Sequence, residues 1–197
     1  MLSPSLLVAA YAEGYFPMGI DDGTIEWFSP DPRGILPLEG LHVSRRLQRV
    51  VRARRFGVTT DRAFRRVMEA CADRRDQGTW ITGEILESYV ALHERGVAHS
   101  VEVWEGETLA GGLYGVSLGG AFFGESMFHR ATDASKVAIV ALVERLRARG
   151  YALLDTQWLT PFLASLGGIE IPREVYLERL QSALEVQTGF VDEGRRE

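Results

Sequence analysis

One short segment of the chain places two polar side chains where a packed scaffold would not need them. Residues 153–157 (Leu-Leu-Asp-Thr-Gln) end an apolar run with Asp155. A carboxylate that closes a buried strand costs free energy unless it is paired or used in chemistry. Because Asp155 and Gln157 are two residues apart, they face the same side of a strand. There the carboxylate could accept a hydrogen bond from an amine while the amide orients it, so we predict an amine-binding site.

Two further side chains stand out as improbable for plain scaffolding. Glu125 is an acid inside a strongly apolar stretch, and Trp80 follows a glycine directly ahead of a predicted helix. Each candidate also has a plain structural explanation: Asp155 could cap a following helix, Glu125 could face solvent, and Trp80 could pack in the core. Five other residues show no partner pattern for nucleophilic catalysis and are interpreted as structural or surface residues: His42, His93, His99, His129 and Cys71.

The elements that must position these side chains follow from apolar periodicity and from turn and cap signals. Helices are expected near residues 3–13, 43–54, 62–73, 83–95, 133–149 and 172–187. Strands are expected near residues 25–28, 56–60, 98–104, 108–116, 121–128 and 151–156. Ser44 and Thr82 are predicted helix N-caps. The order of these elements predicts an α+β fold, because helices come first and an antiparallel meander, a helix, a strand and a last helix follow.

The chain is expected to divide into a small and a large part. The proline- and turn-rich opening, residues 1–40, is interpreted as a small N-terminal domain attached to the main body. Residues 41–190 would form that main domain. The polar residues 191–197 are expected to be a frayed tail.

Charge is distributed very unevenly along the chain. Between Arg45 and Arg66 there are nine arginines against one acid, Asp61, which gives +8 in 22 residues, while the whole chain carries −5 and the remainder therefore −13. The arginines could form the solvated face of an amphipathic helix. However, few acids stand nearby to make helix-stabilising pairs. The cluster therefore favours a polyanionic partner, with an RNA phosphate backbone as the natural one.

Composition excludes several classes of protein. With 46% hydrophobic and 25% charged residues in 197, the chain is typical of folded domains and unlike disordered ones. No apolar stretch approaches the ~20 residues of a membrane span, and the first residues lack the basic start of a secretory signal. A single cysteine allows no internal disulfide, and the scattered histidines offer no zinc-ligand spacing. We therefore expect a cytoplasmic protein without a metal.

Seven segments in this order resemble the leucyl/phenylalanyl-tRNA–protein transferase family. The resemblance extends from about Leu6 to Leu184, behind a start that is shorter than in longer members, and it rests on the ordered set, since no single motif is specific. The segments are Ala-Tyr-Ala-Glu-Gly-Tyr-Phe-Pro (10–17), Trp-Phe-Ser-Pro-Asp-Pro-Arg (27–33), Gly-Thr-Trp-Ile-Thr (78–82), His-Ser-Val-Glu-Val-Trp (99–104), Gly-Gly-Leu-Tyr-Gly (111–115), Gly-Glu-Ser-Met-Phe (124–128) and Asp-Thr-Gln (155–157).

This resemblance implies both a fold and an activity. The implied fold is a small N-terminal domain followed by a domain of the GCN5-related N-acetyltransferase type. The implied reaction moves Leu or Phe, and less well Met, from aminoacyl-tRNA to proteins that begin with Arg or Lys, which marks them for N-end-rule degradation. Neither a cofactor nor coenzyme A nor a membrane is implied as a partner.

The resemblance also implies roles for particular residues. Asp155 and Gln157 would position and activate the α-amine of the acceptor, and Glu125 would assist that network or hold the cationic acceptor. Trp80 would stack near the terminal adenosine of the tRNA. Four apolar residues would line the pocket for the transferred side chain: Leu113, Phe122, Met127 and Leu154. Four arginines would grip tRNA phosphates without reading sequence: Arg45, Arg46, Arg49 and Arg52.

The chain departs from the family pattern at three positions. Met18 stands where some members have Trp after Phe-Pro, Asp133 where Asn is familiar, and Phe162 where His is frequent. These departures put local hydrogen bonds and one aromatic contact to the adenine in doubt more than the overall activity.

Two rival functions are weighed against this one. An acyl-CoA-dependent N-acetyltransferase would need a glycine-rich loop whose amides hold pyrophosphate, yet residues 129–135 contain no glycine. A non-catalytic RNA-binding protein would keep the arginine cluster but would have no need for Asp155, Gln157 and Glu125.

Overall fold

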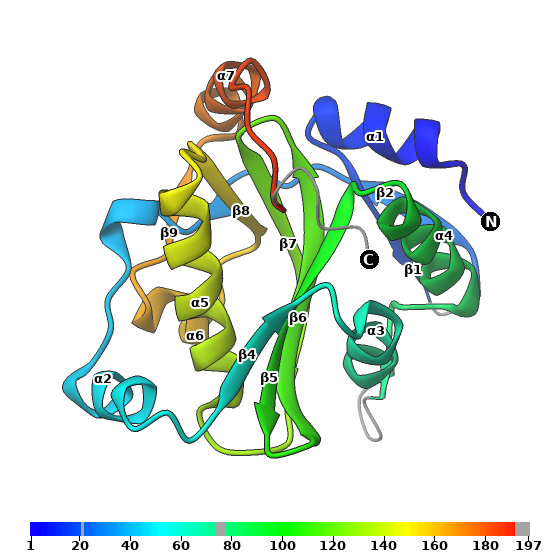
Figure 1. The fold of residues 1–197 in the computed structure, drawn as a ribbon. Coiled ribbons are helices and arrows are strands. Elements are labelled where there is room, and N and C mark those ends of the chain that lie inside the picture. Colours follow the sequence, from blue (N-terminus) through cyan, green and yellow to red (C-terminus); the bar gives the residue numbers. More distant parts are fainter. Residues whose placement is uncertain (21, 74–77, 192–197) are drawn as a thin grey trace.

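The centre of the molecule is a seven-stranded sheet, seen here in a computed structural model (Figure 1). The structure describes residues 1–20, 22–73 and 78–191. The strands of this sheet are β3 (Arg33–Ile35), β4 (Gly57–Thr60), β5 (Ala98–Glu105), β6 (Thr108–Leu118), β7 (Ala121–His129), β8 (Leu153–Gln157) and β9 (Ile169–Ile171). They lie in the order β4-β5-β6-β7-β8-β3-β9, and only β7 and β8 pair in parallel. Together with the helices, this confirms the predicted α+β class.

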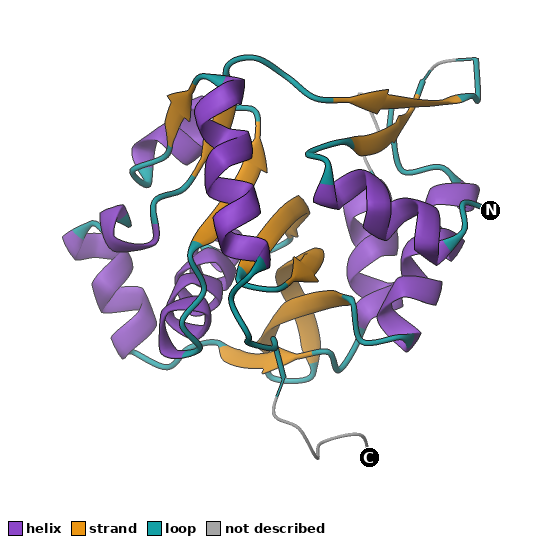
Figure 2. Cartoon of the chain, turned by 90° about the horizontal axis from the view of Figure 1, so that it is seen from above, coloured by secondary structure: helices purple, strands orange, loops and turns teal. Residues whose placement is uncertain are grey.

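Helices cover both faces of the sheet, so each face has its own apolar core (Figures 1 and 2). The helices are α1 (Pro4–Ala12), α2 (Arg45–Arg52), α3 (Phe64–Ala72), α4 (Gly83–Glu94), α5 (Ala134–Ala148), α6 (Pro161–Ser165) and α7 (Arg173–Leu184). Helices α1, α3, α4 and α7 contribute buried residues to one core, and α2, α5 and α6 contribute to the other.

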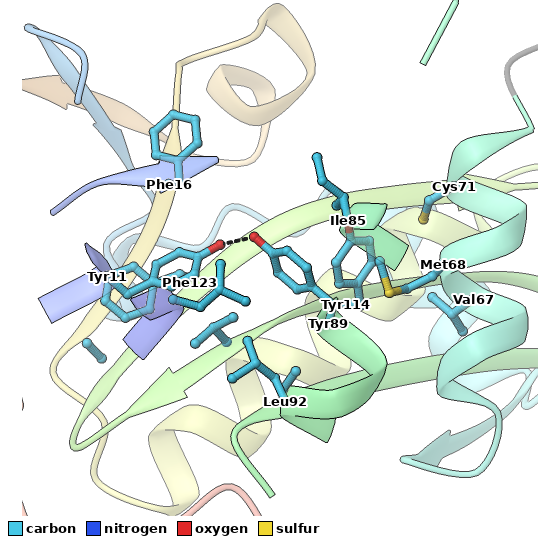
Figure 3. Packing of buried hydrophobic residues seen from close by; sticks show 14 of the residues in the cluster. Tyr11, Phe16, Val67, Met68, Cys71, Ile85, Tyr89, Leu92, Tyr114 and Phe123 are labelled. Atoms are coloured by element: carbon cyan, nitrogen blue, oxygen red, sulfur yellow. Dashed lines mark hydrogen bonds between the residues drawn. The ribbon is translucent and has the colours of Figure 1, made fainter. Parts of the chain in front are cut away.

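The first core is rich in aromatic side chains (Figure 3). Tyr11 of α1 packs against Phe123 of β7 with ring centroids 4.9 Å apart, and Tyr89 of α4 meets Tyr114 of β6 at 5.8 Å. The hydroxyl groups of Tyr11 and Tyr89 are hydrogen-bonded to each other. Aromatic pairs at such tilted geometries add to the free energy of apolar burial, so this core ties α1 and α4 firmly to the sheet.

The parallel pair β7 and β8 is joined by helix α5 and is short. Pairing links residues 121–123 of β7 to residues 153–155 of β8, whereas β7 continues to His129. On its other side, β8 pairs with β3, where Gly34 lies opposite Gln157. The sheet therefore opens between β7 and β8, beyond the point where their pairing ends.

The N-terminal part contains α1 and a two-stranded sheet of β1 (Phe16–Gly19) and β2 (Ile25–Phe28). Strand β3 follows immediately and lies between β8 and β9 in the main sheet. The main sheet thus recruits Arg33–Ile35, which lie before the predicted boundary at residue 40. The expected tail falls on residues 191–197, of which 192–197 lie outside the described residues.

Helix starts are where the sequence is most informative. Ser44 accepts a hydrogen bond from Leu47 N at 3.2 Å and Thr82 accepts one from Ile85 N at 3.2 Å, so both predicted N-caps are confirmed. Strands β1, β3 and β9 and helix α6 were not predicted; each spans five residues or fewer, too short for a periodic signal. Within the described part of the chain, no helix is long and apolar enough to cross a membrane.

Candidate functional site

A cavity of about 410 Å³ occupies the opening between β7 and β8. Its walls come from both faces of the sheet: residues of β6, β7 and β8, the side chains of α5 and α6, and β1 with Trp80. The lining is mostly apolar, and a few polar groups converge on it. This combination is typical of a small-molecule or side-chain binding pocket.

Glu125 is the acidic group of this cavity and is turned into it by a bulge in β7. In the β6–β7 ladder Tyr114 lies opposite Ser126 and Gly115 lies opposite Gly124, so Glu125 is the extra, unpaired residue. Its Oε1 accepts a hydrogen bond from Gln157 Nε2 at 2.7 Å, and its Oε2 accepts one from Tyr89 Oη at 3.2 Å. Only 9% of Glu125 is exposed, which disagrees with the solvent-facing alternative.

Gln157 is aimed by an unusual backbone conformation at the end of β8. Its φ of 61° lies in the left-handed region, which is uncommon for residues other than glycine. Its backbone N–H donates to Asp155 Oδ1 at 2.9 Å, while its side-chain amide donates to Glu125. A strained backbone held by such contacts is found preferentially at functional sites. Regular strand alternation therefore does not explain how Gln157 is placed.

Asp155 lies behind the cavity and not on its wall. Its side chain is fully buried and accepts two hydrogen bonds from Arg33, from Nε at 2.9 Å and from NH2 at 2.6 Å. Tyr176 Oη of α7 donates to Asp155 Oδ2 at 2.8 Å. Arg33 also donates to the carbonyl oxygen of Gly14 at 2.9 Å. Asp155 therefore reaches the cavity through Gln157, and Thr160, not Asp155, caps the following helix α6.

The environment of Glu125 strongly favours its protonated form. Burial is the main cause, and it raises the pKa of Glu125 to about 8, with the charge of Asp155 acting in the same direction. Hydrogen bonds from Tyr11 and Tyr89 oppose this effect. Burial also raises the pKa of both phenols, so they remain neutral donors. Figure 3 shows their two hydroxyl groups hydrogen-bonded to each other. The Tyr11–Tyr89 pair thus ends at a carboxyl group whose pKa is raised to about 8.

The predicted pocket residues are brought together with one exception. Trp80, Leu113, Met127 and Leu154 line the cavity. Phe122 does not: it is fully buried and stacks on Phe190 with ring centroids 5.0 Å apart, so its predicted place in the pocket is corrected to a place in the core beneath.

Two of the three departures from the family pattern, Met18 and Phe162, also lie on the cavity wall. The third, Asp133, stands at the N-terminus of α5 with φ 69° and pairs with Arg46 at 2.8 Å and with Lys136 at 3.6 Å.

The four arginines proposed for RNA contact all lie on α2 and are exposed. They are carried by a helix whose buried Leu47 packs in the same core as α5. The ion pair of Arg46 with Asp133 leaves the others on the solvent side: Arg45, Arg49 and Arg52. The basic face of α2 is therefore continuous with the side of the sheet that α5 covers.

Several site residues were missed by sequence reasoning. Arg33 and Tyr11 lie in quoted motifs but carried no individual signal, and Tyr89 and Tyr176 look like ordinary helix residues. Thr156 lines the cavity, and within the described chain its buried Oγ1 has no hydrogen-bond partner. A buried hydroxyl without a partner is costly, so its place in the cavity wall makes it a candidate contact for a ligand.

Comparison with known protein families matches almost the whole chain. Residues 35–181 match the family described as leucyl/phenylalanyl-tRNA protein transferase, and residues 1–31 match its N-terminal domain.

Curated relatives named leucyl/phenylalanyl-tRNA–protein transferase are similar over nearly their full length. The Salinibacter ruber protein is 56% identical over 96% of this chain and 83% of its own. The Cereibacter sphaeroides protein is 56% identical over 98% of this chain and 90% of its own. The Herpetosiphon aurantiacus protein is 54% identical over 96% of this chain and 98% of its own.

Two solved structures show a more distant likeness. A GCN5-related N-acetyltransferase-like protein from Streptococcus suis aligns with a TM-score of 0.40 at 16% identity, over 85% of this chain and 63% of that one. L-PGS from Bacillus licheniformis aligns with a TM-score of 0.42 at 13% identity, over 80% of this chain and 54% of that one.

Proposed function

The chain belongs to the leucyl/phenylalanyl-tRNA protein transferase family and is an aminoacyltransferase, and on this premise we propose its substrates. It moves Leu or Phe, and less well Met, from aminoacyl-tRNA to the N-terminal Arg or Lys of an acceptor protein. The product is a substrate for N-end-rule degradation in the cytoplasm. The reaction takes place without a membrane and without coenzyme A.

The observation that carries this proposal is an apolar cavity with a Glu–Gln pair at its polar end. The walls formed by Leu113, Met127 and Leu154 accept an apolar side chain that is not branched at Cβ, such as that of Leu or Phe. Shape alone separates side chains that differ by one methylene by only ~1–3 kcal/mol. The cavity therefore supports a preference for a few related amino acids, with Met as a poorer member.

The chemistry requires positioning more than activation. The α-amine of the acceptor attacks the carbonyl carbon of the aminoacyl ester, a C–N bond forms and the ester C–O bond breaks. The amine loses one proton, and the ribose hydroxyl of the terminal adenosine leaves with one. Because the ester is already activated, orientation, deprotonation of the amine and support for the oxyanion are sufficient.

Each polar group of the cavity has a part in these steps. Gln157 orients the attacking amine, and Glu125 in its ionised form receives the proton. The free hydroxyl of Thr156 is available to donate to the developing oxyanion. Asp155 is a positioning residue: through its bond to Gln157 N and its pair with Arg33, it fixes the strand end that carries Gln157.

Two surfaces are assigned to the RNA. Trp80 is half-buried at the cavity and stacks near the terminal adenosine. Arg45, Arg46, Arg49 and Arg52 on α2 bind backbone phosphates, which gives affinity without sequence reading.

The acetyltransferase alternative is disfavoured by the start of α5. A pyrophosphate is usually held by free backbone amides at a helix N-terminus. Here Asp133 places a carboxylate at that position, paired with Arg46 and Lys136. Saturable binding of acetyl-CoA at micromolar concentration would contradict this assignment.

The deciding experiment uses tRNA charged with radiolabelled leucine and two peptides that differ only in their first residue, Arg or Ala. Label passing only to the Arg peptide, without ATP or coenzyme A, is the expected result. Binding of tRNA without transfer would favour a non-catalytic RNA-binding protein. Equal labelling of both peptides would contradict the proposed acceptor specificity.

A further inference from the structure

A second cavity of about 470 Å³ lies at the edge of the sheet, away from the reaction cavity. It is formed by β4, by the start of α3 and by the hairpin between β5 and β6, and it has Trp104 in its wall. Among the described residues, none lines both cavities. The half-buried indole of Trp104 lies directly across the ladder from Gly57, which has no side chain to cover it.

A chain of buried hydrogen bonds holds the indole in place. Trp104 Nε1 donates to Thr59 Oγ1 at 2.7 Å, and Thr59 Oγ1 donates to Glu102 Oε2 at 2.6 Å. Glu102 is fully buried, and its Oε1 accepts from Ser100 Oγ at 2.5 Å and from Ala63 N at 3.2 Å. The ring is therefore fixed before any ligand arrives, which lowers the entropy lost on binding.

The guanidinium groups of two exposed arginines lie over this ring. The guanidinium carbon of Arg62 lies 5.8 Å from the centroid of the Trp104 ring and that of Arg66 lies 5.3 Å away. Within the described residues, neither arginine has a carboxylate partner within 4.0 Å, and both line the cavity. Glu107 is the acidic residue in the same wall, so the three side chains leave a net positive charge.

We propose that Trp104, Arg62 and Arg66 form a second nucleic-acid contact, which stacks one unpaired base of the tRNA on the indole and binds its flanking phosphates. A fixed aromatic ring with two guanidinium groups over it, neither of them paired with a carboxylate of the described residues, matches the needs of a single-stranded nucleotide, which offers a flat base and a charged backbone. An acidic peptide would use the arginines but would have no need of the ring. The inference rests on the proposed function for the identity of the RNA.

The site extends the RNA surface to the other side of the sheet. The arginines of α2 lie with the core that contains α5, whereas Trp104 packs against the core that contains α3 and α4. Strand β4 at the sheet edge separates the two groups along the chain (Figure 1). A long substrate such as tRNA can reach both sides, which a short acceptor peptide cannot.

Binding of uncharged tRNA at several salt concentrations tests the proposal. Trp104→Ala is expected to raise Kd about 5- to 100-fold, the effect of losing one stacked base, while Trp104→Phe keeps most of the affinity. Arg62→Ala and Arg66→Ala are each expected to lower the slope of log K against log salt by about one. Glu107→Gln acts in the opposite direction and tightens binding.

Controls separate this site from misfolding and from the reaction cavity. Arg179→Ala removes an exposed arginine of α7 and is expected to leave Kd unchanged. Each variant is melted to verify that it is folded at the temperature of the binding assay. Transfer at saturating Leu-tRNA is expected to keep its kcat with a raised KM.

Three results would overturn the inference or separate it from the proposed function. An unchanged Kd in folded Trp104→Ala would overturn it. Variants of Arg62 or Arg66 that bind an acidic peptide more weakly than the parent, but bind tRNA as tightly as it does, would also overturn the inference. Failure of the wild-type protein to bind tRNA would instead contradict the proposed function itself.

Discussion

At the scale of single residues, the reaction depends on when Glu125 carries a proton. Burial raises its pKa to about 8, which is close to the ~7.7–8.0 of a free α-amino group. A donor and a base with similar pKa values exchange a proton with little free-energy difference, which is the arrangement that general-base catalysis favours. Tyr89 and Gln157 hold the two carboxyl oxygens in place for this exchange.

We expect the transfer rate to rise with pH and to level off above about pH 8, because both the amine and Glu125 are then unprotonated. Glu125→Gln keeps the size of the side chain but removes the base, and its rate should fall by about 100-fold or more. Its remaining pH dependence should report the acceptor amine alone. Single-turnover rates between about pH 6 and about pH 9 test this. A Gln variant with the parent rate would exclude Glu125 as the base.

The raised pKa of Glu125 also makes the free energy of unfolding depend on pH, and the sign of this dependence follows from the direction of the shift. Since the folded-state pKa of Glu125 is raised above its unfolded value, the folded protein binds the extra proton between about pH 4.5 and pH 8. The free energy of unfolding therefore falls as pH rises through this window and is constant beyond it. Glu125→Gln should be more stable than the parent at pH 8, by on the order of a few kcal/mol, and closer to it at low pH. Urea denaturation across the window checks the sign; a constant difference would contradict it.

The Arg33–Asp155 pair is expected to be structural first. Arg33→Met leaves a fully buried carboxylate without its cation and should lower the free energy of unfolding by about 3–5 kcal/mol. Arg65→Met is the matched control, because it breaks an exposed two-bond pair with Glu87 that solvent screens, so its effect should be much smaller. Denaturant midpoints of both variants measure the difference.

The positioning role of Asp155 makes a separate prediction for activity. A folded Asp155→Asn variant keeps an acceptor oxygen for Gln157 N, so it should lose less kcat than Asp155→Ala, with KM for tRNA unchanged. Asp155→Ala at the parent rate would contradict any role in the reaction.

At the scale of elements, the bulge in β7 is what turns an acid of an apolar strand into the cavity. Gly115 of β6 faces this bulge, and a Cβ there would collide with the carbonyl oxygen of Phe123 and approach Phe122 Cε1 to 2.5 Å. The two strands can approach so closely because residue 115 has no side chain.

Gly115→Ala is therefore expected to push β6 away from the bulge. The cost should be about 1–3 kcal/mol in the free energy of unfolding, and transfer should fall because Glu125 moves. Gly83→Ala is the control: no atom lies within 4 Å of a Cβ there, and alanine suits the first turn of α4. Thermal melts and transfer rates of both variants test this. Equal effects would show that the bulge does not depend on Gly115.

Much of this arrangement could be predicted from sequence, and the rest could not for identifiable reasons. Periodicity located the long helices and the meander, and cap residues located the starts of α2 and α4. The Asp155–Gln157 spacing pointed to the segment that the structure places at the cavity, but strand alternation could not reveal the left-handed backbone of Gln157. The ion pair with Arg33 joins positions 122 residues apart, a distance that no local pattern bridges.

At the scale of the whole molecule, the arginine-rich segment is divided by the fold. Residues that are continuous in sequence are placed on two sides of the sheet edge, four arginines on α2 and two beside Trp104. The remaining chain is acidic, so positive potential is concentrated around β4. Such a distribution steers a polyanion toward one end of the molecule and speeds its association.

Contacts on the two sides of the edge are expected to contribute independently to RNA affinity. Arg49→Ala and Arg66→Ala each remove one phosphate contact, and the double variant should show the sum of their effects within about 0.5 kcal/mol, because the sheet separates them and they share no partner. Arg62→Ala with Arg66→Ala is the matched comparison: both flank one indole, so their effects should couple. The measurement is the Kd for tRNA of each single and double variant at one low salt concentration, which gives a double-mutant cycle for each pair. Strong coupling between Arg49 and Arg66 would mean that both bind the same part of the RNA, and the two sides would then form one contact surface.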